Sequence, residues 1–92
     1  MSEIKIKSSK PIAQIKKGDK IKVNDLVLEV DAHALLIKHS DTTKEMAIDC
    51  FDSKTDKDYQ IRYFSDRVED SLQFYELAEI VYNEVEIEKI EW

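Results

Sequence analysis

Residues 16–51 read KKGDKIKVNDLVLEVDAHALLIKHSDTTKEMAIDCF, in which short apolar runs alternate with turn residues. Gly18 is the only glycine in the chain and can adopt positive φ without steric cost, so we expect a turn there. With the segment that follows, the pattern predicts strands over residues 20–23, 26–31, 34–39, 45–51 and 59–64. Such spacing is typical of small barrels and curled sheets. We therefore expect a mostly β fold, either a small SH3-like barrel or a curled antiparallel sheet.

The flanking segments extend this pattern into one small β-rich domain, residues 1–92. Isoleucines alternate with lysines near the start, so residues 1–15 are expected to form a basic edge strand or arm. Residues 66–82 fit one short helix, and their aromatic residues fit strands nearly as well. Residues 84–92 interleave glutamates with apolar residues and predict a strand with a bulge near Lys89.

Charge is distributed unevenly along the chain. Residues 1–23 hold seven lysines and two acids, a net of +5, whereas the remaining residues hold 7 basic and 18 acidic side chains, a net of −11, which together give −6. One interpretation is that the basic segment pairs with the acidic remainder of its own fold. The other is that it contacts phosphates locally, within a Debye length of roughly 8 Å.

Several function classes find no support in the sequence. The longest uninterrupted apolar stretch, residues 34–37, is far too short to cross a membrane, and the charged N-terminal segment is not a signal peptide. With one cysteine, these features indicate a cytoplasmic protein that contacts no membrane. No glycine-rich phosphate loop or Gly-x-Ser-x-Gly motif is present, and His33, His39 and Cys50 lack zinc-site spacing. We expect no enzyme activity, no cofactor and no metal.

The order of features from Lys17 to Phe51 resembles the N-terminal SH3-like (KOW-type) barrel of elongation factor P and of its hypusine-bearing archaeal and eukaryotic counterpart. The shared features are a Lys-Gly-Asp opening at residues 17–19, an Ile-x-Val strand, a tight turn, a protruding loop and the strand from residue 45 to residue 52. The resemblance covers about half of the chain and implies the barrel of a translation protein. In that family glycines surround a modified lysine in the loop. Here residues 39–44 contain no glycine, and Lys44 is the lysine nearest that place.

The first candidate function is therefore a non-catalytic module that docks on ribosomal or other structured RNA. Basic residues would contact phosphates and an aromatic ring would stack on bases. The candidate RNA-binding residues are Lys5, Lys7, Lys10, Lys16, Lys17, Lys20, Lys22, Arg62, Tyr63 and Arg67. For the last three the alternative is structural, with Tyr63 in the core and the arginines paired with nearby acids.

The second candidate is a protein-interaction module that binds no nucleic acid. The acidic C-terminal strand would then pair with the edge of another protein or with itself, since exposed edge strands favour such association. The candidate interaction residues are Val85, Ile87, Ile90 and Trp92.

Overall fold

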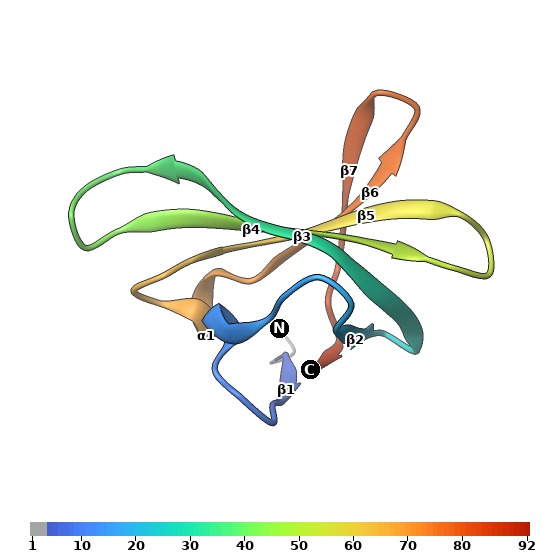
Figure 1. The fold of residues 1–92 in the computed structure, drawn as a ribbon, viewed down its shortest axis with the longest axis horizontal. Coiled ribbons are helices and arrows are strands. Elements are labelled where there is room, and N and C mark those ends of the chain that lie inside the picture. The colour runs from blue at the N-terminus through green and yellow to red at the C-terminus, as the bar shows by residue number, and fades with distance from the viewer. Residues whose placement is uncertain (1–3) are drawn as a thin grey trace.

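The computed structural model describes residues 4–92 as one eight-stranded sheet in the order β1-β8-β2-β3-β4-β5-β6-β7 (Figure 1). Neighbouring strands are antiparallel except β1 and β8, which are parallel. The sheet curls on itself but does not close, because β1 and β7 remain at its two ends. The expected mostly β fold is confirmed.

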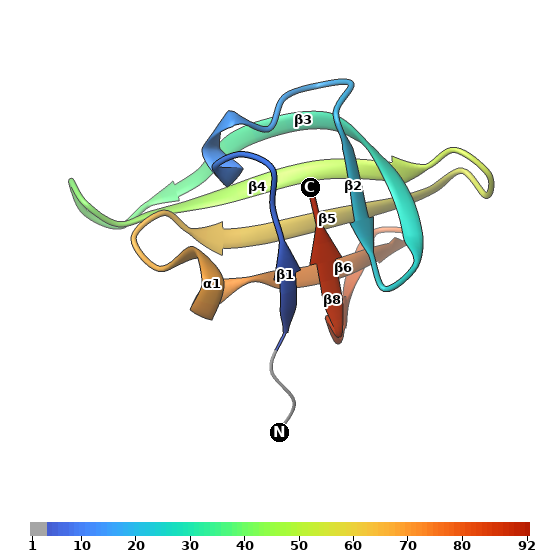
Figure 2. The same cartoon turned by 90° about the horizontal axis from the view of Figure 1, so that it is seen from below.

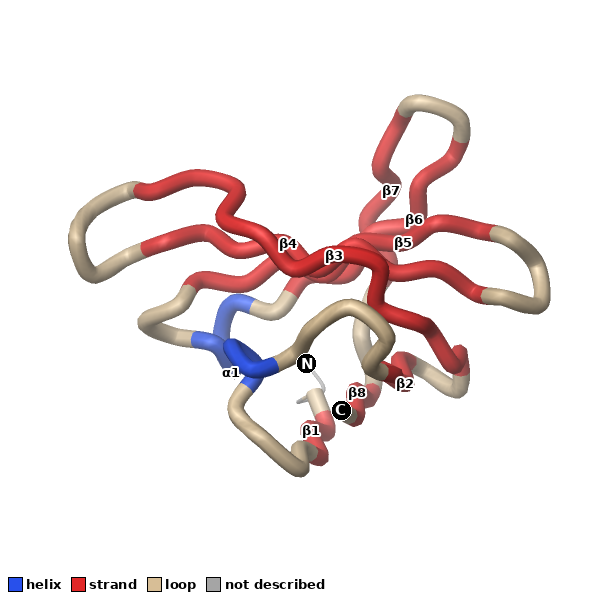
Figure 3. Tube along the Cα trace, in the orientation of Figure 1, coloured by secondary structure: helices blue, strands red, loops and turns tan. Residues whose placement is uncertain are grey.

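Strands make up most of the chain, and the helices are single turns (Figure 3). The elements are β1 (Lys5–Lys7), the 3-10 helix η1 (Ile12–Gln14), β2 (Lys20–Val23), β3 (Leu26–Lys38), β4 (Lys44–Asp52), β5 (Lys57–Phe64), α1 (Val68–Ser71), β6 (Gln73–Ala78), β7 (Val81–Val85) and β8 (Lys89–Glu91). No helix among residues 4–92 has the length and apolar character needed to cross a membrane.

The curl of the sheet encloses one core. Seen in Figures 1 and 2, β1, β8 and β2 lie across one side of β3–β6. Alternating residues of the strands point inward, since successive side chains of a strand face opposite sides of the sheet. The most fully buried apolar side chains are Ile21, Val23, Leu28, Val30, Ile48, Ile61, Phe74 and Ile90.

Strand β3 is one continuous element, whereas we expected two strands over residues 26–31 and 34–39. The register against β4 shifts between Val30 and Ala32 and again between Leu35 and Ile37. Such irregularities bend a strand and increase its twist without ending it. The first irregularity, at Asp31, therefore lies next to residues 32 and 33, where the sequence predicted a break between strands.

The sequence was compatible with either a short helix or strands over residues 66–82, and the structure contains both. One helical turn, α1, is followed by β6, a two-residue turn and β7. Glu79 occupies this turn with φ 58°, and the resulting hairpin projects from the body of the sheet (Figure 1). Phe74 is fully buried, so the first half of the hairpin belongs to the core.

The C-terminal segment differs from its prediction. Strand β7 ends at Val85 and β8 begins at Lys89, so the chain leaves the sheet near the expected bulge. It re-enters between β1 and β2, where β8 pairs with both (Figure 2). The predicted C-terminal edge strand is therefore wrong, because β8 has a neighbour on each side.

Asn24 lies in the β2–β3 turn and connects this turn to residues 86–89 through hydrogen bonds. It has φ 49°, a conformation that asparagine tolerates better than most residues. Its side-chain Nδ2 donates to the Glu86 carbonyl at 2.7 Å, and its Oδ1 accepts from the backbone N–H groups of Glu88 and Lys89 at 2.7 and 3.2 Å. Its own backbone N–H donates to the Lys89 carbonyl at 3.0 Å.

We expect Asn24→Gly to lower the free energy of unfolding by about 1–2 kcal/mol, because it removes three side-chain hydrogen bonds and preserves positive φ. Asn24→Ala should cost more, since alanine also disfavours that φ. Urea denaturation followed by Trp92 fluorescence measures both. Asp25→Asn in the same turn is the control and should have the smaller effect. Equal losses in the Asn24 and Asp25 variants would contradict a role for the Asn24 side chain.

Candidate functional site

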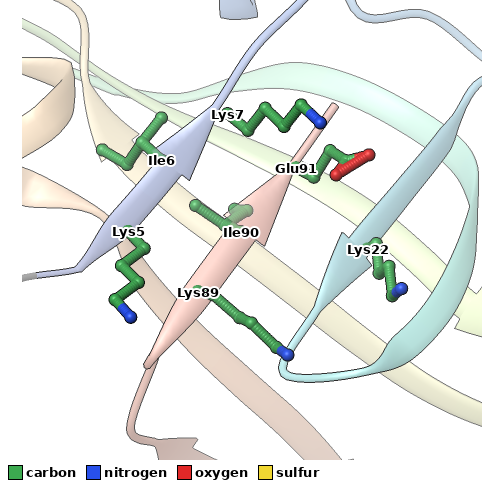
Figure 4. A pocket seen from close by; sticks show the side chains of 7 residues that line it. All are labelled: Lys5, Ile6, Lys7, Lys22, Lys89, Ile90 and Glu91. Carbon is green, nitrogen blue, oxygen red and sulfur yellow. The ribbon is translucent and has the colours of Figure 1, made fainter.

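Lysines from three strands gather on the outer surface of the β1-β8-β2 part of the sheet. Lys5 pairs in register with Lys89, whereas Lys7 and Lys22 both pair with Glu91. These five residues, with Ile6 and Ile90 beneath, line a shallow hollow of about 260 Å³ (Figure 4). We call Lys5, Lys7, Lys22 and Lys89 the lysine face.

The lysine face follows from the alternation of residues in three strands. Strand β1 reads Lys-Ile-Lys, β8 reads Lys-Ile-Glu and β2 begins Lys-Ile-Lys. The period-2 geometry of a strand turns the isoleucines into the core and the charged residues outward. Ile21 and Ile90 are 1% and 2% exposed. Burial of the isoleucines thus fixes where the lysines point.

Local ion pairs neutralise part of this surface. Lys89 Nζ lies 2.8 Å from Asp25 Oδ1, and this hydrogen bond raises the pKa of Lys89 and lowers that of Asp25. Within residues 4–92, no carboxylate lies within 4.0 Å of Nζ of Lys5, Lys7 or Lys22. These three lysines leave the lysine face positively charged.

The other lysines of the predicted basic segment lie at different places. Lys20 borders the lysine face, in a hollow that Lys7 and Lys22 also line, and its Nζ lies 3.0 Å from Glu29 Oε1. Lys10 binds Asp19 at 2.5 Å, and this hydrogen bond lowers the pKa of the Asp19 carboxyl. Lys16 and Lys17 are exposed in the loop before β2 and line none of the hollows of the lysine face.

Tyr63, predicted to stack on bases, is only 2% exposed, so its ring cannot reach a base in the folded chain. Its hydroxyl lies 2.7 Å from His33 Nε2, and His33 Nδ1 lies 2.8 Å from the Ile15 carbonyl oxygen. The prediction for Tyr63 is wrong because the period of β5 turns this position inward. The Tyr63 ring is part of the hydrophobic core instead.

Arg62 lies on β5 and Arg67 on the loop after it, and neither lines the two hollows at the lysine face. The Arg62 guanidinium stacks 4.5 Å from the centroid of the Tyr75 ring, and its Nε donates to Gln60 Oε1 at 2.5 Å. Arg67 is exposed and stacks 4.9 Å from the centroid of the Phe64 ring. The structure thus brings neither arginine to the lysines.

The predicted C-terminal interaction surface does not form. Ile87 and Ile90 are 7% and 2% exposed and belong to the core. Trp92 is half-buried, and its indole Nε1 donates to the Lys10 carbonyl at 2.7 Å. Val85, also half-buried, is the last residue of β7. Within residues 4–92, β1 and β7 are the strands at the two ends of the sheet, and residues 31–38 of β3 also have no strand partner on the β2 side.

The metal-capable side chains are dispersed among other contacts. His39 Nε2 lies 3.6 Å from Glu45 Oε1, and Cys50 is buried with its Sγ 3.7 Å from the Tyr59 carbonyl oxygen. Nowhere in residues 4–92 do three His, Cys, Asp or Glu side chains converge on a point that could hold a metal ion.

Two groups of surface residues were missed by reasoning from sequence. Lys89 completes the lysine face but lies in the acidic C-terminal segment. The alternation Lys89-Ile90-Glu91 is the sequence feature that could have predicted an outward-facing lysine here. Large apolar side chains are also exposed at two hairpins, namely Leu35, Leu36 and Ile37 on β3 and Ile80, Val81 and Tyr82 at the β6–β7 turn.

The sequence matches no protein-family model, no curated protein and no solved structure. The chemistry of the lysine face and of the sheet edges is therefore what points to a function.

Burial makes stability sensitive to alkaline pH. It raises the pKa of Tyr63 to about 12 from an ordinary value of 10, and that of Cys50 to about 12 from 9. The folded state holds these protons more tightly, so their contribution to stability is complete below the ordinary pKa values and is lost as the pH rises to about 12. We expect the free energy of unfolding to fall between pH 9 and 12.

Denaturant titrations across this pH range test the expectation. Cys50→Ala should weaken the decline from about pH 9 upward, and Tyr63→Phe should weaken it only above about pH 10. An undiminished slope in both variants would show that other groups control alkaline unfolding.

Proposed function

We propose that this protein is a non-catalytic RNA-binding module that docks on ribosomal or other structured RNA through the lysine face. One observation carries the proposal: the β1-β8-β2 register gathers Lys5, Lys7, Lys22 and Lys89 on one exposed face of an otherwise acidic chain. A phosphate backbone presents the complementary charge, and lysine is a common point contact for it.

The charge of the whole chain shapes how such binding works. With a net charge of −6, the body of the protein is repelled by a polyanion at long range. Screening restricts this repulsion to roughly 8 Å at physiological salt. The lysine face must therefore approach the backbone closely, with the acidic strands turned away. Binding of this kind is modest in affinity and specific in orientation.

The chemistry of the face indicates what part of RNA it contacts. Among residues 4–92, the side chains that line this hollow are aliphatic or charged. The aromatic ring of the adjoining hollow, Trp92, is half-buried and its indole N–H donates a hydrogen bond to the Lys10 carbonyl. Stacking on splayed bases needs such rings, whereas contact with the phosphates of a folded helix does not. Structured RNA therefore fits this surface better than unpaired strands. The resemblance to the N-terminal barrel of elongation factor P supports RNA of the translation apparatus as the target.

Replacing Lys5, Lys7 and Lys22 together with alanine should weaken binding to a fluorescently labelled RNA hairpin. The slope of log affinity against log salt should fall by about 0.9 for each lost phosphate contact, so by about 2–3 in total. Fluorescence anisotropy at several salt concentrations measures both quantities. Circular dichroism verifies that the variant remains folded.

The matched control replaces Lys38, Lys54 and Lys57, which are exposed on the β3–β4 and β4–β5 hairpins and do not line the lysine face, and changes the net charge by the same amount. It should leave the affinity and the salt slope nearly unchanged. Equal losses in both triple variants would mean that only overall charge matters and would overturn the proposed site. Sedimentation with ribosomal subunits at low and high salt then tests the proposed target.

A further inference from the structure

Strand β7 leaves one edge of the sheet open. It is the last strand in the sheet order, and the hairpin that carries it projects from the body (Figure 1). Its sequence, Val-Tyr-Asn-Glu-Val, has no proline or lysine, the residues that commonly prevent edge pairing. The opposite edge strand, β1, is three residues long and carries two lysines. Of the two terminal strands, β7 is the unprotected one.

The backbone groups that β7 offers follow from its pairing with β6. The two-residue turn is flanked by the pair Ala78 and Val81, and pairing continues to Phe74 and Val85. In such a hairpin the flanking pair and every second pair after it exchange hydrogen bonds. Val81, Asn83 and Val85 therefore turn their backbone groups toward β6. Those of Tyr82 and Glu84 point outward.

We propose that β7 pairs antiparallel with β7 of a second copy of this chain, about a two-fold axis at Asn83. In this register Asn83 faces Asn83 of the second copy, and Tyr82 faces Glu84. The outward backbone groups then bond each other across the axis, and all five residues of the strand are used.

Side-chain chemistry favours this register over its neighbours. A two-fold axis at Glu84 would place two carboxylates directly opposite each other, which is destabilising. An axis at Tyr82 would pair only residues 81–83 of one strand with residues 81–83 of the other. Glu84 and Val85 would then have no partner in the β7 strand of the second copy. The axis at Asn83 puts each carboxylate opposite a tyrosine instead.

Charge complementarity also points to a second copy as the occupant. The Arg62 guanidinium lies 5.5 Å from the centroid of the Tyr82 ring, and within residues 4–92 it forms no ion pair. Glu84 likewise forms none there. Pairing about Asn83 places Glu84 of the second copy beside Tyr82, so that the Tyr82 ring lies between this carboxylate and the Arg62 guanidinium of β5. The two-fold axis repeats this arrangement in the second copy.

Asn83→Cys tests the register directly. In a non-hydrogen-bonded antiparallel pair the Cα atoms lie about 4.5 Å apart, within the range of a disulfide. We expect this variant to form a disulfide-linked dimer in a glutathione redox buffer, seen on non-reducing gels. Cys50 does not compete, because it is 2% exposed and burial raises its pKa to about 12.

Val81→Cys is the matched control on the same face of the same strand. In the proposed register its two sulfurs would stand four residues apart along the strand, about 14 Å, too far to bond. It should cross-link roughly tenfold less than Asn83→Cys. Equal cross-linking of the two variants, or none from Asn83→Cys, would overturn the proposal.

The mass of the unmodified protein provides an independent measurement. Sedimentation equilibrium at rising concentration should show a monomer–dimer equilibrium. Glu84→Pro should shift it toward monomer, because proline removes an outward N–H and leaves the β6 bonds intact. A monomeric mass at every concentration up to the millimolar range would also overturn the proposal.

Discussion

Asn24 holds the C-terminal segment in place through four hydrogen bonds to residues 86–89. Strand β8 enters the sheet beside this anchor, between β1 and β2, so that the two ends of the chain become neighbours. Without β8, β1 would lose its pairing partner and the core would lose Ile90. A short polar side chain in a two-residue turn thus secures contacts between residues more than 80 positions apart.

The same insertion creates the lysine face. Lysines of β1 and β2 are separated by the width of one strand, and β8 fills that gap with Lys89 and Glu91. Because the isoleucines beneath are buried, the positive side chains have no inward alternative. The packing that buries these isoleucines therefore also turns the lysines toward solvent.

The curled, open topology separates two surfaces with different chemistry. One end of the sheet carries charge on a short, protected edge, and the other carries exposed apolar and aromatic side chains on a projecting hairpin. Between them the strands supply the shared core. Self-association through β7 would therefore leave the lysine face of each copy free, and a dimer would present two such faces to one polyanion. Such bivalency raises avidity without any new contact.

The mostly β fold, the Gly18 turn and most strands could be predicted from the sequence, because period-2 alternation and turn residues act locally. The sequence could not decide which strands are neighbours. Sheet order depends on contacts between distant segments, and this is why the C-terminal strand was misjudged as an edge and Lys89 was missed as a member of the lysine face. Likewise, the spacing of Tyr63 and the arginines suggested a shared surface, but the inward turn of residue 63 on β5 was settled only by the core that formed around it. Which face each strand buries, and with it which charges are left in solvent, depends on that core.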